Sequence, residues 1–414
     1  MSLKIALIAD VRGPSTCSWS SYFIRCGHEV HIISSYAAPA GCTGAASFHV
    51  VPIATSYSDQ AADARAAGKR SAALRTKAVA TIRNGKLLQP AALAQVTMTA
   101  LSARKRAPVV RQLLDDIDPD LVHALRIPCE GILAEQAVGR RPFIVSTWGN
   151  DLTLFARYHP WLGWLTRRVL GRADGLLSDC ERDLRLARRW GFDSAKPNIF
   201  VPGSGGIQTS LFHPGTPDPE LLDQLHIAPG APVIINPRGF RGYVRNDTFF
   251  RAIPLVLGKF PSAVFLCSSM QGQPGAERWV RSLNIGHAVR LLPHVPRDQM
   301  ARFFRLAQVM VSFSTHDGTP NSMLEAMACG CFPVAGDIES VREWIVDGQN
   351  GLLVDSADPK AAAAAMIEAL ADGDLRRQAQ SRNANLIVER ADYGKMMARA
   401  GQFYEHVLAL HRPG

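Results

Sequence analysis

The sequence has few of the features that mark membrane-spanning, secreted or metal-binding proteins. In 414 residues no apolar run approaches the roughly 18 residues that a membrane span requires. The first ten residues contain too short an apolar run for a signal peptide and predict a β-strand instead. The eight cysteines are scattered, with no C-x-x-C pair. They predict neither a metal site nor a disulfide framework, and a reducing cytoplasm is the expected location.

Acidic residues are absent from one long segment. None occurs between Ala64 and Leu114, where eleven basic residues do. The segment is rich in Ala and Leu and predicts helices. Their basic residues form either a solvated face or a patch that contacts an anionic membrane. The eleven residues are Arg65, Lys69, Arg70, Arg75, Lys77, Arg83, Lys86, Arg104, Lys105, Arg106 and Arg111.

The overall charge points to anionic partners. The net charge is +10, which favours nucleotide sugars or lipid head groups. Nothing resembles a nucleic-acid-binding module, so nucleic acid is not an expected partner. A peripheral membrane contact through residues 65–111 would place the protein at the inner face of the membrane.

Residues 312–355 carry the most informative pattern. A strand ending near Phe313 is followed by a polar turn, an apolar helix closed by Gly330, and a second strand from Phe332 to Ala335. Strand, glycine-containing turn, helix and strand in this order form the βαβ unit of a parallel sheet.

The turn before this helix has the composition of an anion-binding site. A helix N-terminus offers unpaired N–H groups and the positive end of the helix dipole, where phosphate oxygens bind well. Asp317 precedes the helix and Glu325 lies within it, so both carboxylates could bind sugar hydroxyls of the same ligand. An Asx-type turn at Asp317 and a solvated Glu325 are an equally good interpretation of these residues alone. The turn comprises Gly318, Thr319, Pro320, Asn321 and Ser322.

Several spaced elements together resemble one family. Asp317-x7-Glu325, the helix end AMACG, the strand FPVAG and the turn GQNGLLV occur in the order found in retaining glycosyltransferases of family 4, which have the GT-B fold. The segments GHEVHIIS and PDLVHA are similar to strands of the first domain of that family. At the first acidic position the family usually has Glu, where this chain has Asp317.

The resemblance implies roles for residues of the second half of the chain. In the family the first carboxylate, here Asp317, contacts the donor sugar, and the second, here Glu325, holds the ribose. An Arg and a Lys in an earlier loop bind the donor diphosphate. Arg238 fits the first of these. No Lys follows it, and Arg245 is the best candidate for the second cation, with Arg241 behind it.

Two residues of the first half are also candidates. Ser15 lies in the loop after the first strand, which is expected near the donor phosphate or the acceptor. This loop lacks G-x-G-x-x-G, which argues against a dinucleotide site. Asp151 follows the strand FIVST and is expected to face the acceptor or the transferred sugar. Trp148 stands where the family commonly has a His that contacts the donor sugar.

The expected architecture is α/β, with two Rossmann-like, doubly wound parallel-sheet domains that face each other across a cleft. Residues 1–205 would bind the acceptor and residues 206–390 the nucleotide sugar. Residues 391–414 would form a helix that crosses back to the first domain, as the resemblance implies.

The expected reaction is retaining transfer of a sugar from a nucleotide diphosphate sugar to an acceptor hydroxyl, with no cofactor and no metal. UDP is the favoured donor nucleotide and GDP is possible; the acceptor is a glycan or a lipid-linked molecule of the cell envelope. Arg238, Arg245 and the helix start would stabilise the leaving diphosphate. Two alternatives stay open: an epimerase of UDP-sugars with the same fold, and a catalytically silent subunit that binds a sugar nucleotide.

Overall fold

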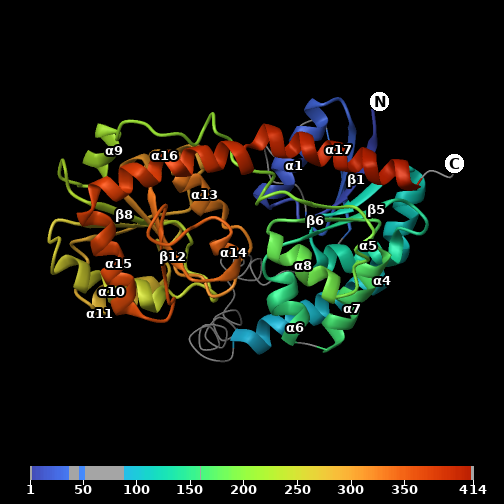
Figure 1. Ribbon diagram of the computed structural model, residues 1–414. Coiled ribbons are helices and arrows are strands. Elements are labelled where there is room, and N and C mark those ends of the chain that lie inside the picture. The colour runs from blue at the N-terminus through green and yellow to red at the C-terminus, as the bar shows by residue number, and fades with distance from the viewer. Residues whose placement is uncertain (1, 37–45, 52–87, 159, 412–414) are drawn as a thin grey trace. The chain divides into compact units, whose positions relative to one another are not determined.

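A computed structural model describes residues 2–36, 46–51, 88–158 and 160–411. The chain divides into two compact units (Figure 1). Unit 1 comprises Met1–Gly205 and Met397–Gly414, and unit 2 comprises Gly206–Met396. The last helix, α17 (Tyr393–His411), therefore belongs mainly to unit 1 although it follows unit 2 in the sequence.

Unit 1 is built on a parallel sheet of seven strands in the order β3-β2-β1-β4-β5-β6-β7. The residues of β4, β5 and β6 are all buried, as expected for strands that are covered on both faces. The strands are β1 (Lys4–Ile8), β2 (Glu29–Ser34), β3 (Ser47–Val50), β4 (Leu121–Ala124), β5 (Phe143–Thr147), β6 (Gly175–Ser178) and β7 (Asn198–Phe200).

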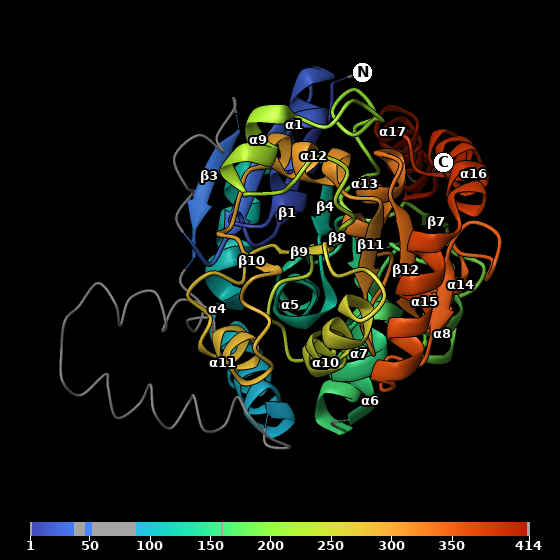
Figure 2. The same ribbon diagram turned by 90° about the vertical axis from the view of Figure 1, so that its left-hand side faces the viewer.

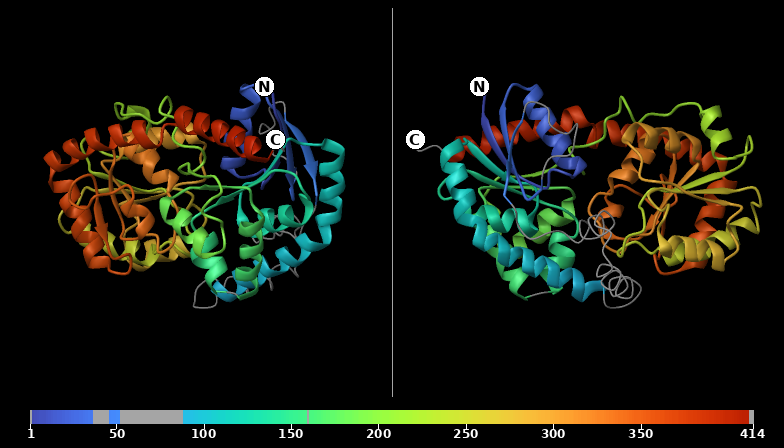
Figure 3. Two further views of the ribbon diagram at one scale, coloured as in Figure 1. Left: turned by 45° about the vertical axis from the view of Figure 1, so that its right-hand side comes forward. Right: turned by 180° about the vertical axis from the view of Figure 1, so that it is seen from behind.

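Helices cover both faces of this sheet. The chain moves along the sheet in one direction from β1 to β2 and in the other from β4 to β6, so right-handed crossovers place the connecting helices on opposite faces. The long helix α4 packs on α5, and α5 packs on α7 (Figure 3). The helices are α1 (Pro14–Arg25), α4 (Leu88–Ile117), α5 (Ile132–Ala137), α6 (Ala156–Tyr158), α7 (Pro160–Arg172) and α8 (Glu181–Arg189), with π-helical turns η1 (Ile127–Gly131) and η2 (Asp151–Phe155).

A buried polar cluster attaches α17 to unit 1. The Tyr404 hydroxyl lies 2.5 Å from Nδ1 of His123 on β4 and accepts a hydrogen bond of 2.7 Å from the indole N–H of Trp19 on α1. The other ring nitrogen of His123 lies 2.8 Å from the Ser146 hydroxyl. The Tyr404 ring also stacks on Phe23. Burial lowers the pKa of His123 to about 3, so the ring is neutral and both its nitrogens are used for hydrogen bonding.

Replacement of Tyr404 by Phe should destabilise the protein. The substitution keeps the ring stack but leaves Nδ1 of His123 and the indole N–H of Trp19 without their partner, which costs about 1–3 kcal/mol for a buried polar group. The free energy of unfolding, measured by urea denaturation, checks this. An unfolding curve that coincides with that of the unchanged protein would contradict it.

Unit 2 is built on a parallel sheet of six strands in the order β10-β9-β8-β11-β12-β13. Its strands are short and apolar, and all residues of β8, β9, β11 and β12 are buried. The strands are β8 (Val233–Asn236), β9 (Val264–Cys267), β10 (Val289–Leu291), β11 (Val309–Ser312), β12 (Phe332–Gly336) and β13 (Leu352–Val354).

The helices of unit 2 form two layers (Figure 2). The helices α10 (Asn246–Leu257), α11 (Pro274–Ser282) and α15 (Pro359–Ala371) cover one face, and α12 (Arg297–Leu306), α13 (Asn321–Ala328) and α16 (Gly373–Arg390) cover the other. The core between the sheet and α10 and α15 contains Phe249, Phe250, Ile253 and Met366, none of which is exposed. Two short helices, α9 (Pro219–Gln224) and α14 (Glu339–Arg342), complete the unit.

The predicted fold class is confirmed, because each unit is a doubly wound parallel α/β sheet. The βαβ unit expected over residues 312–355 is β11, α13 and β12. Much of the basic segment 65–111 lies outside the described residues, which resume at Leu88. Within the described residues no helix is both long and apolar enough to cross a bilayer.

The cysteines depart from the expectation at one position. Six of the described cysteines are free, including the buried Cys267, Cys329 and Cys331. Cys17 is disulfide-bonded, so one disulfide forms where the cysteine pattern predicted no disulfide framework. The spacing of the cysteines alone does not identify which of them pair.

Candidate active site

The candidate site of unit 2 lies where the strand order reverses. The chain proceeds from β8 to β9 and β10 in one direction and from β11 to β12 and β13 in the other. The carboxyl ends of β8 and β11 therefore flank the switch point, where ligands of doubly wound sheets bind. Arg238 follows β8 and Asp317 follows β11, and the two form an ion pair across this point.

Backbone hydrogen bonds fix the two loops that carry this pair. The amide of Arg245 donates to the Phe313 carbonyl, and the amide of Thr315 donates to the Tyr243 carbonyl, each over 2.9 Å. The loop after β8 is thereby attached to the loop after β11. Arg238 and Asp317 are far apart in the sequence. The strand order of the sheet and this short ladder of two backbone hydrogen bonds bring them together.

Arg238 is largely buried and held in place from several directions. Its backbone amide donates to Oδ1 of Asn236 over 3.1 Å, and its Nη1 donates to the Ser322 hydroxyl over 3.3 Å. Its Nε is buried without a hydrogen-bond partner among the described residues. A buried guanidinium N–H that lacks a protein partner is available to an anionic ligand.

The start of α13 adds a second positive element. The N-cap residue, Pro320, makes no side-chain capping hydrogen bond, and the start of a helix carries the positive end of its dipole, which favours an anion. The turn before it is anchored by the indole N–H of Trp344, which donates to the Thr319 hydroxyl over 3.1 Å. The Ser340 hydroxyl donates to the Asp317 carbonyl over 2.8 Å. The Thr319 hydroxyl therefore stabilises the turn, whereas the Ser322 hydroxyl accepts a hydrogen bond from Arg238.

Further polar groups at this edge lack protein partners. The hydroxyls of Ser268, Ser312 and Ser314 are buried and have no hydrogen-bond partner among the described residues. All three lie at or just after the carboxyl ends of β9 and β11. Because burying an unpaired hydroxyl is costly, their position at the ligand-binding edge favours a polar occupant, either ligand or water.

Glu325 lies in α13 and forms an ion pair that the sequence analysis did not anticipate. Its Oε1 accepts a hydrogen bond of 2.9 Å from Nη2 of Arg297, the first residue of α12. The Arg297 guanidinium also lies over the ring of Phe212, 5.1 Å from its centroid. Burial raises the pKa of Glu325, and Arg297 opposes that rise. Only Oε1 is bonded to Arg297, which leaves Oε2 for a ligand hydroxyl.

The structure distinguishes the two candidates for a second cation. Arg245 forms a bidentate pair with Asp247, with both N–O distances at 2.8 Å, so its charge is neutralised locally. Arg241 is exposed, donates to the Tyr243 hydroxyl over 2.8 Å and interacts electrostatically with Asp317. Arg241 is therefore better placed than Arg245 to act with Arg238, the reverse of the order expected from sequence spacing.

Asp151, in unit 1, has a different environment from the one expected. It is fully buried and accepts hydrogen bonds from Nε of Arg126 at 3.0 Å and from the amides of Ile127 and Trp148 at 3.2 Å each. Both of its oxygens are therefore bonded to the protein. Asp151 positions the partly exposed Arg126 at the carboxyl end of β4, and Arg126 is the group that a ligand can reach.

Ser15 lies in the first turn of α1, at the carboxyl end of β1. Its hydroxyl is 2.7 Å from that of Ser204, so it connects the first βα loop to the end of the unit 1 sequence before unit 2 begins. Ser15 and Asp151 belong to unit 1, and the other predicted site residues belong to unit 2.

One group among the described residues could hold a metal ion, namely Asp179, Cys180 and Asp183 after β6. Arg182 already forms an ion pair of 2.8 Å with Asp183 and donates to the Gly149 carbonyl over 3.0 Å. Burial raises the pKa of Asp183 to about 6. A guanidinium therefore occupies the position of positive charge that a cation would take, and the group serves the packing of α8.

Replacement of Arg238 by Gln should weaken binding of UDP by about tenfold to a hundredfold, the loss expected for one charge-assisted hydrogen-bonding partner. Arg245→Gln is the matched control, because Asp247 already neutralises that guanidinium, and it should change the dissociation constant by no more than about threefold. Calorimetric titration without metal measures both. Equal losses in the two variants would contradict this assignment of the site.

Replacement of Arg297 by Gln should change the pH dependence of UDP binding. The family resemblance implies that Glu325 holds the ribose, and a carboxylate accepts a hydroxyl best when it is ionised. Because the loss of Arg297 raises the pKa of Glu325 further, affinity should fall at a higher pH as the solution is acidified. Dissociation constants measured between about pH 8 and about pH 5 test this. In Glu325→Gln binding should be weak and lose this pH dependence; superimposable profiles for Arg297→Gln and the unchanged protein would refute the role of Arg297.

Comparison with known sequences gives a consistent result for both units. The family model described as "Glycosyl transferases group 1" matches residues 220–386, and that described as "Glycosyl transferase 4-like domain" matches residues 13–203. A D-inositol 3-phosphate glycosyltransferase of Corynebacterium urealyticum is 27% identical over 223 residues, and one of Thermobispora bispora is 27% identical over 229 residues. These alignments cover 51% and 53% of this chain and the same shares of the relatives, so the chain spans about half the length of the curated relatives it matches.

Solved structures share the fold over nearly the whole chain. A sucrose-phosphate synthase from Thermosynechococcus elongatus aligns with a TM-score of 0.75 and 15% identity, covering 99% of this chain and 100% of the other. HepE of Anabaena, solved with UDP and glucose, aligns with a TM-score of 0.70 and 14% identity, covering 98% and 100%. The family matches to both units, together with this architecture, show that the chain belongs to the family-4-type glycosyltransferases of the GT-B fold.

Proposed function

We propose that the protein transfers a hexose-type sugar from a UDP-sugar to an acceptor hydroxyl with retention of configuration at the anomeric carbon. The observation that carries the proposal is the Arg238–Asp317 pair at the switch point of unit 2, beside the uncapped start of α13. HepE of Anabaena, which shares the fold, was solved with UDP-glucose, and this favours uridine as the donor base. A GDP-sugar is the alternative donor.

The positive groups of the site suit a departing diphosphate. As the bond between the anomeric carbon and the β-phosphate oxygen breaks, negative charge grows on that oxygen. Arg238, the start of α13 and Arg241 would stabilise this charge where it develops. The acceptor oxygen bonds to the same face of the sugar, and its proton passes to the departing phosphate oxygen. The arginines supply the charge that a metal ion would otherwise supply, so the proposed reaction needs no metal and no cofactor.

The two carboxylates hold the rest of the donor. Glu325 would accept a hydrogen bond from a ribose hydroxyl through Oε2, since Arg297 occupies Oε1. Asp317 forms an ion pair with Arg238 and would also contact a hydroxyl of the transferred sugar. The family usually has Glu at this position, and the side chain of Asp317 is shorter. It is compatible with this double role because it already contacts Arg238.

The acceptor is proposed to be a glycan or a lipid-linked molecule of the cell envelope. The relatives named D-inositol 3-phosphate glycosyltransferase favour a polyol hydroxyl as the attacking group. In unit 1, Arg126 is a partly exposed cation at the carboxyl end of β4 and could bind a phosphate carried by the acceptor. The basic segment 65–111 would bring the protein to an anionic membrane; of this segment Arg104, Lys105, Arg106 and Arg111 are exposed on α4.

The purified protein should consume one UDP-sugar in the presence of EDTA and a suitable acceptor, and the product should keep the anomeric configuration of the donor. Proton NMR of the product, with a panel of UDP-, GDP- and ADP-sugars and polyol, glycan and lipid acceptors, measures this. Asp317→Ala and Glu325→Ala should abolish most of the turnover. Full activity in either variant would refute the proposed roles.

The same assay separates the alternatives. Conversion of a UDP-sugar to its epimer without any acceptor would identify an epimerase. Tight binding of a sugar nucleotide without turnover across the whole panel would identify a catalytically silent subunit.

A further inference from the structure

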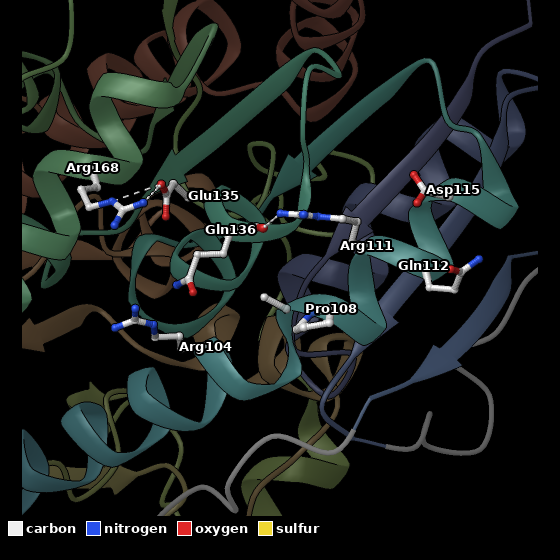
Figure 4. Close-up of a pocket in the computed structure, with 9 residues that line it drawn as sticks. Arg104, Pro108, Arg111, Gln112, Asp115, Glu135, Gln136 and Arg168 are labelled. Carbon is white, nitrogen blue, oxygen red and sulfur yellow. Dashed lines mark hydrogen bonds and ion pairs between the residues drawn. The ribbon is translucent and has the colours of Figure 1, made fainter.

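A groove of about 540 Å³ lies on the helical layer of unit 1, between α4, α5 and α7 (Figure 4). Each of these helices runs back toward the amino end of the strand that follows it, and Arg111, Gln136 and Arg168 lie near their carboxyl ends. The groove therefore faces away from the carboxyl edge of the sheet, where Arg126 and Asp151 lie. It is separate from the site described above.

Three guanidinium groups from two helices line this groove: Arg104 and Arg111 of α4 and Arg168 of α7. On α4, residues 103, 107, 110, 114 and 117 form the buried stripe, and residues 104, 108, 111 and 115 follow next to it at the spacing of one helical face. Arg104 and Arg111 thus stand two turns apart on the border of the packed face, both directed at the groove.

The acidic groups in the groove are already neutralised. Asp115 accepts from Nη2 of Arg141 over 2.8 Å, and Glu135 accepts from Nη2 of Arg168 over 2.6 Å. Among the residues whose side chains are described, Arg104 has no acidic partner within ion-pair distance. The groove therefore carries a surplus of positive charge in a concave surface, which concentrates anions.

The remaining lining groups indicate the kind of anion. Arg111 donates one N–H to the Gln136 carbonyl over 2.6 Å and has further donors available. Gln112 and Gln136 line the same space; their amide nitrogens donate to Asp116 and to the Ile132 carbonyl, and their amide oxygens can accept from hydroxyl groups. Guanidinium groups bind phosphate oxygens in a bidentate manner. The volume of the groove is in the range of small-molecule sites, and its lining is too polar for an apolar ligand.

We propose that this groove binds a phosphate ester that carries hydroxyl groups, either free in solution or as the head group of an anionic lipid. The site goes beyond the proposed transferase activity and does not depend on it. The indole of Trp164 stands beside Arg168, 5.0 Å from its guanidinium, and its side chain is exposed. An exposed Trp beside Arg168 is compatible with a lipid as the source of the phosphate, because Trp partitions into the membrane interface.

Arg104 provides the decisive variant. Glycerol 3-phosphate should bind the full-length protein, and Arg104→Gln should weaken that binding by about tenfold, the loss of one charge-assisted contact. Arg106→Gln is the matched control, since it removes the same charge from the same helix at an exposed position that does not line the groove. It should change the dissociation constant by no more than about twofold. Calorimetric titration at constant ionic strength measures both variants.

Two outcomes would overturn the proposal: an equal loss in Arg104→Gln and Arg106→Gln, which would mean diffuse attraction only, or the absence of saturable binding of glycerol 3-phosphate. UDP binding, measured on the same samples, should be unchanged in both variants, so failure of this site is distinguishable from failure of the donor site.

Vesicles distinguish the two sources of phosphate. If the ligand is a lipid head group, the protein should sediment with vesicles of phosphatidylglycerol in phosphatidylcholine, glycerol 3-phosphate should displace it, and Arg104→Gln should sediment less than Arg106→Gln. If the ligand is a soluble ester, glycerol 3-phosphate should bind with the same dependence on Arg104 and the vesicles should not compete.

Discussion

The candidate site of unit 2 depends on one ion pair, between Arg238 and Asp317. The pair joins the loops that leave two neighbouring strands on either side of the point where the strand order reverses. A short backbone ladder between the same loops fixes their spacing. Arg238 is almost buried, and Asp317 stabilises its charge. The guanidinium lies beside the space before α13. The positive helix end, the guanidinium and the unpaired hydroxyls at this edge then favour the same kind of ligand, a diphosphate that carries sugars.

A second ion pair of the same kind shapes the carboxyl edge of unit 1. There the roles of the partners are reversed, since the carboxylate of Asp151 is fully buried and the guanidinium of Arg126 is partly exposed. Each unit thus has an arginine at the carboxyl end of its sheet that is paired with a carboxylate of the protein. A buried carboxylate is costly unless it is paired and hydrogen-bonded, and Asp151 meets this condition with an arginine and two backbone amides.

Several further pairs in the structure determine which charges remain for ligands. Arg245 forms an ion pair with Asp247, and Arg182 with Asp183. Arg241 and Arg104 have no carboxylate bonded to them among the described residues. The polar groups of the Tyr404 cluster bond to one another and attach α17 to unit 1. They differ in this from polar groups that face open space. Counting arginines along the chain therefore overstates the number of cations that a phosphate can reach.

The sequence by itself determined the fold class and the βαβ unit around Asp317 and Glu325, because short buried strands, a glycine-containing turn and an apolar helix are local patterns that neighbouring residues fix. It also predicted Arg238, which follows a strand directly, as a site residue. Only the tertiary structure shows that Arg245 is paired with Asp247, that Asp151 holds Arg126 in place, and that Arg297 contacts Glu325. These outcomes depend on which side chain lies closest to which charge in the folded chain, and that proximity has no trace in sequence spacing, since α12 and α13 meet only when both pack on the same face of one sheet.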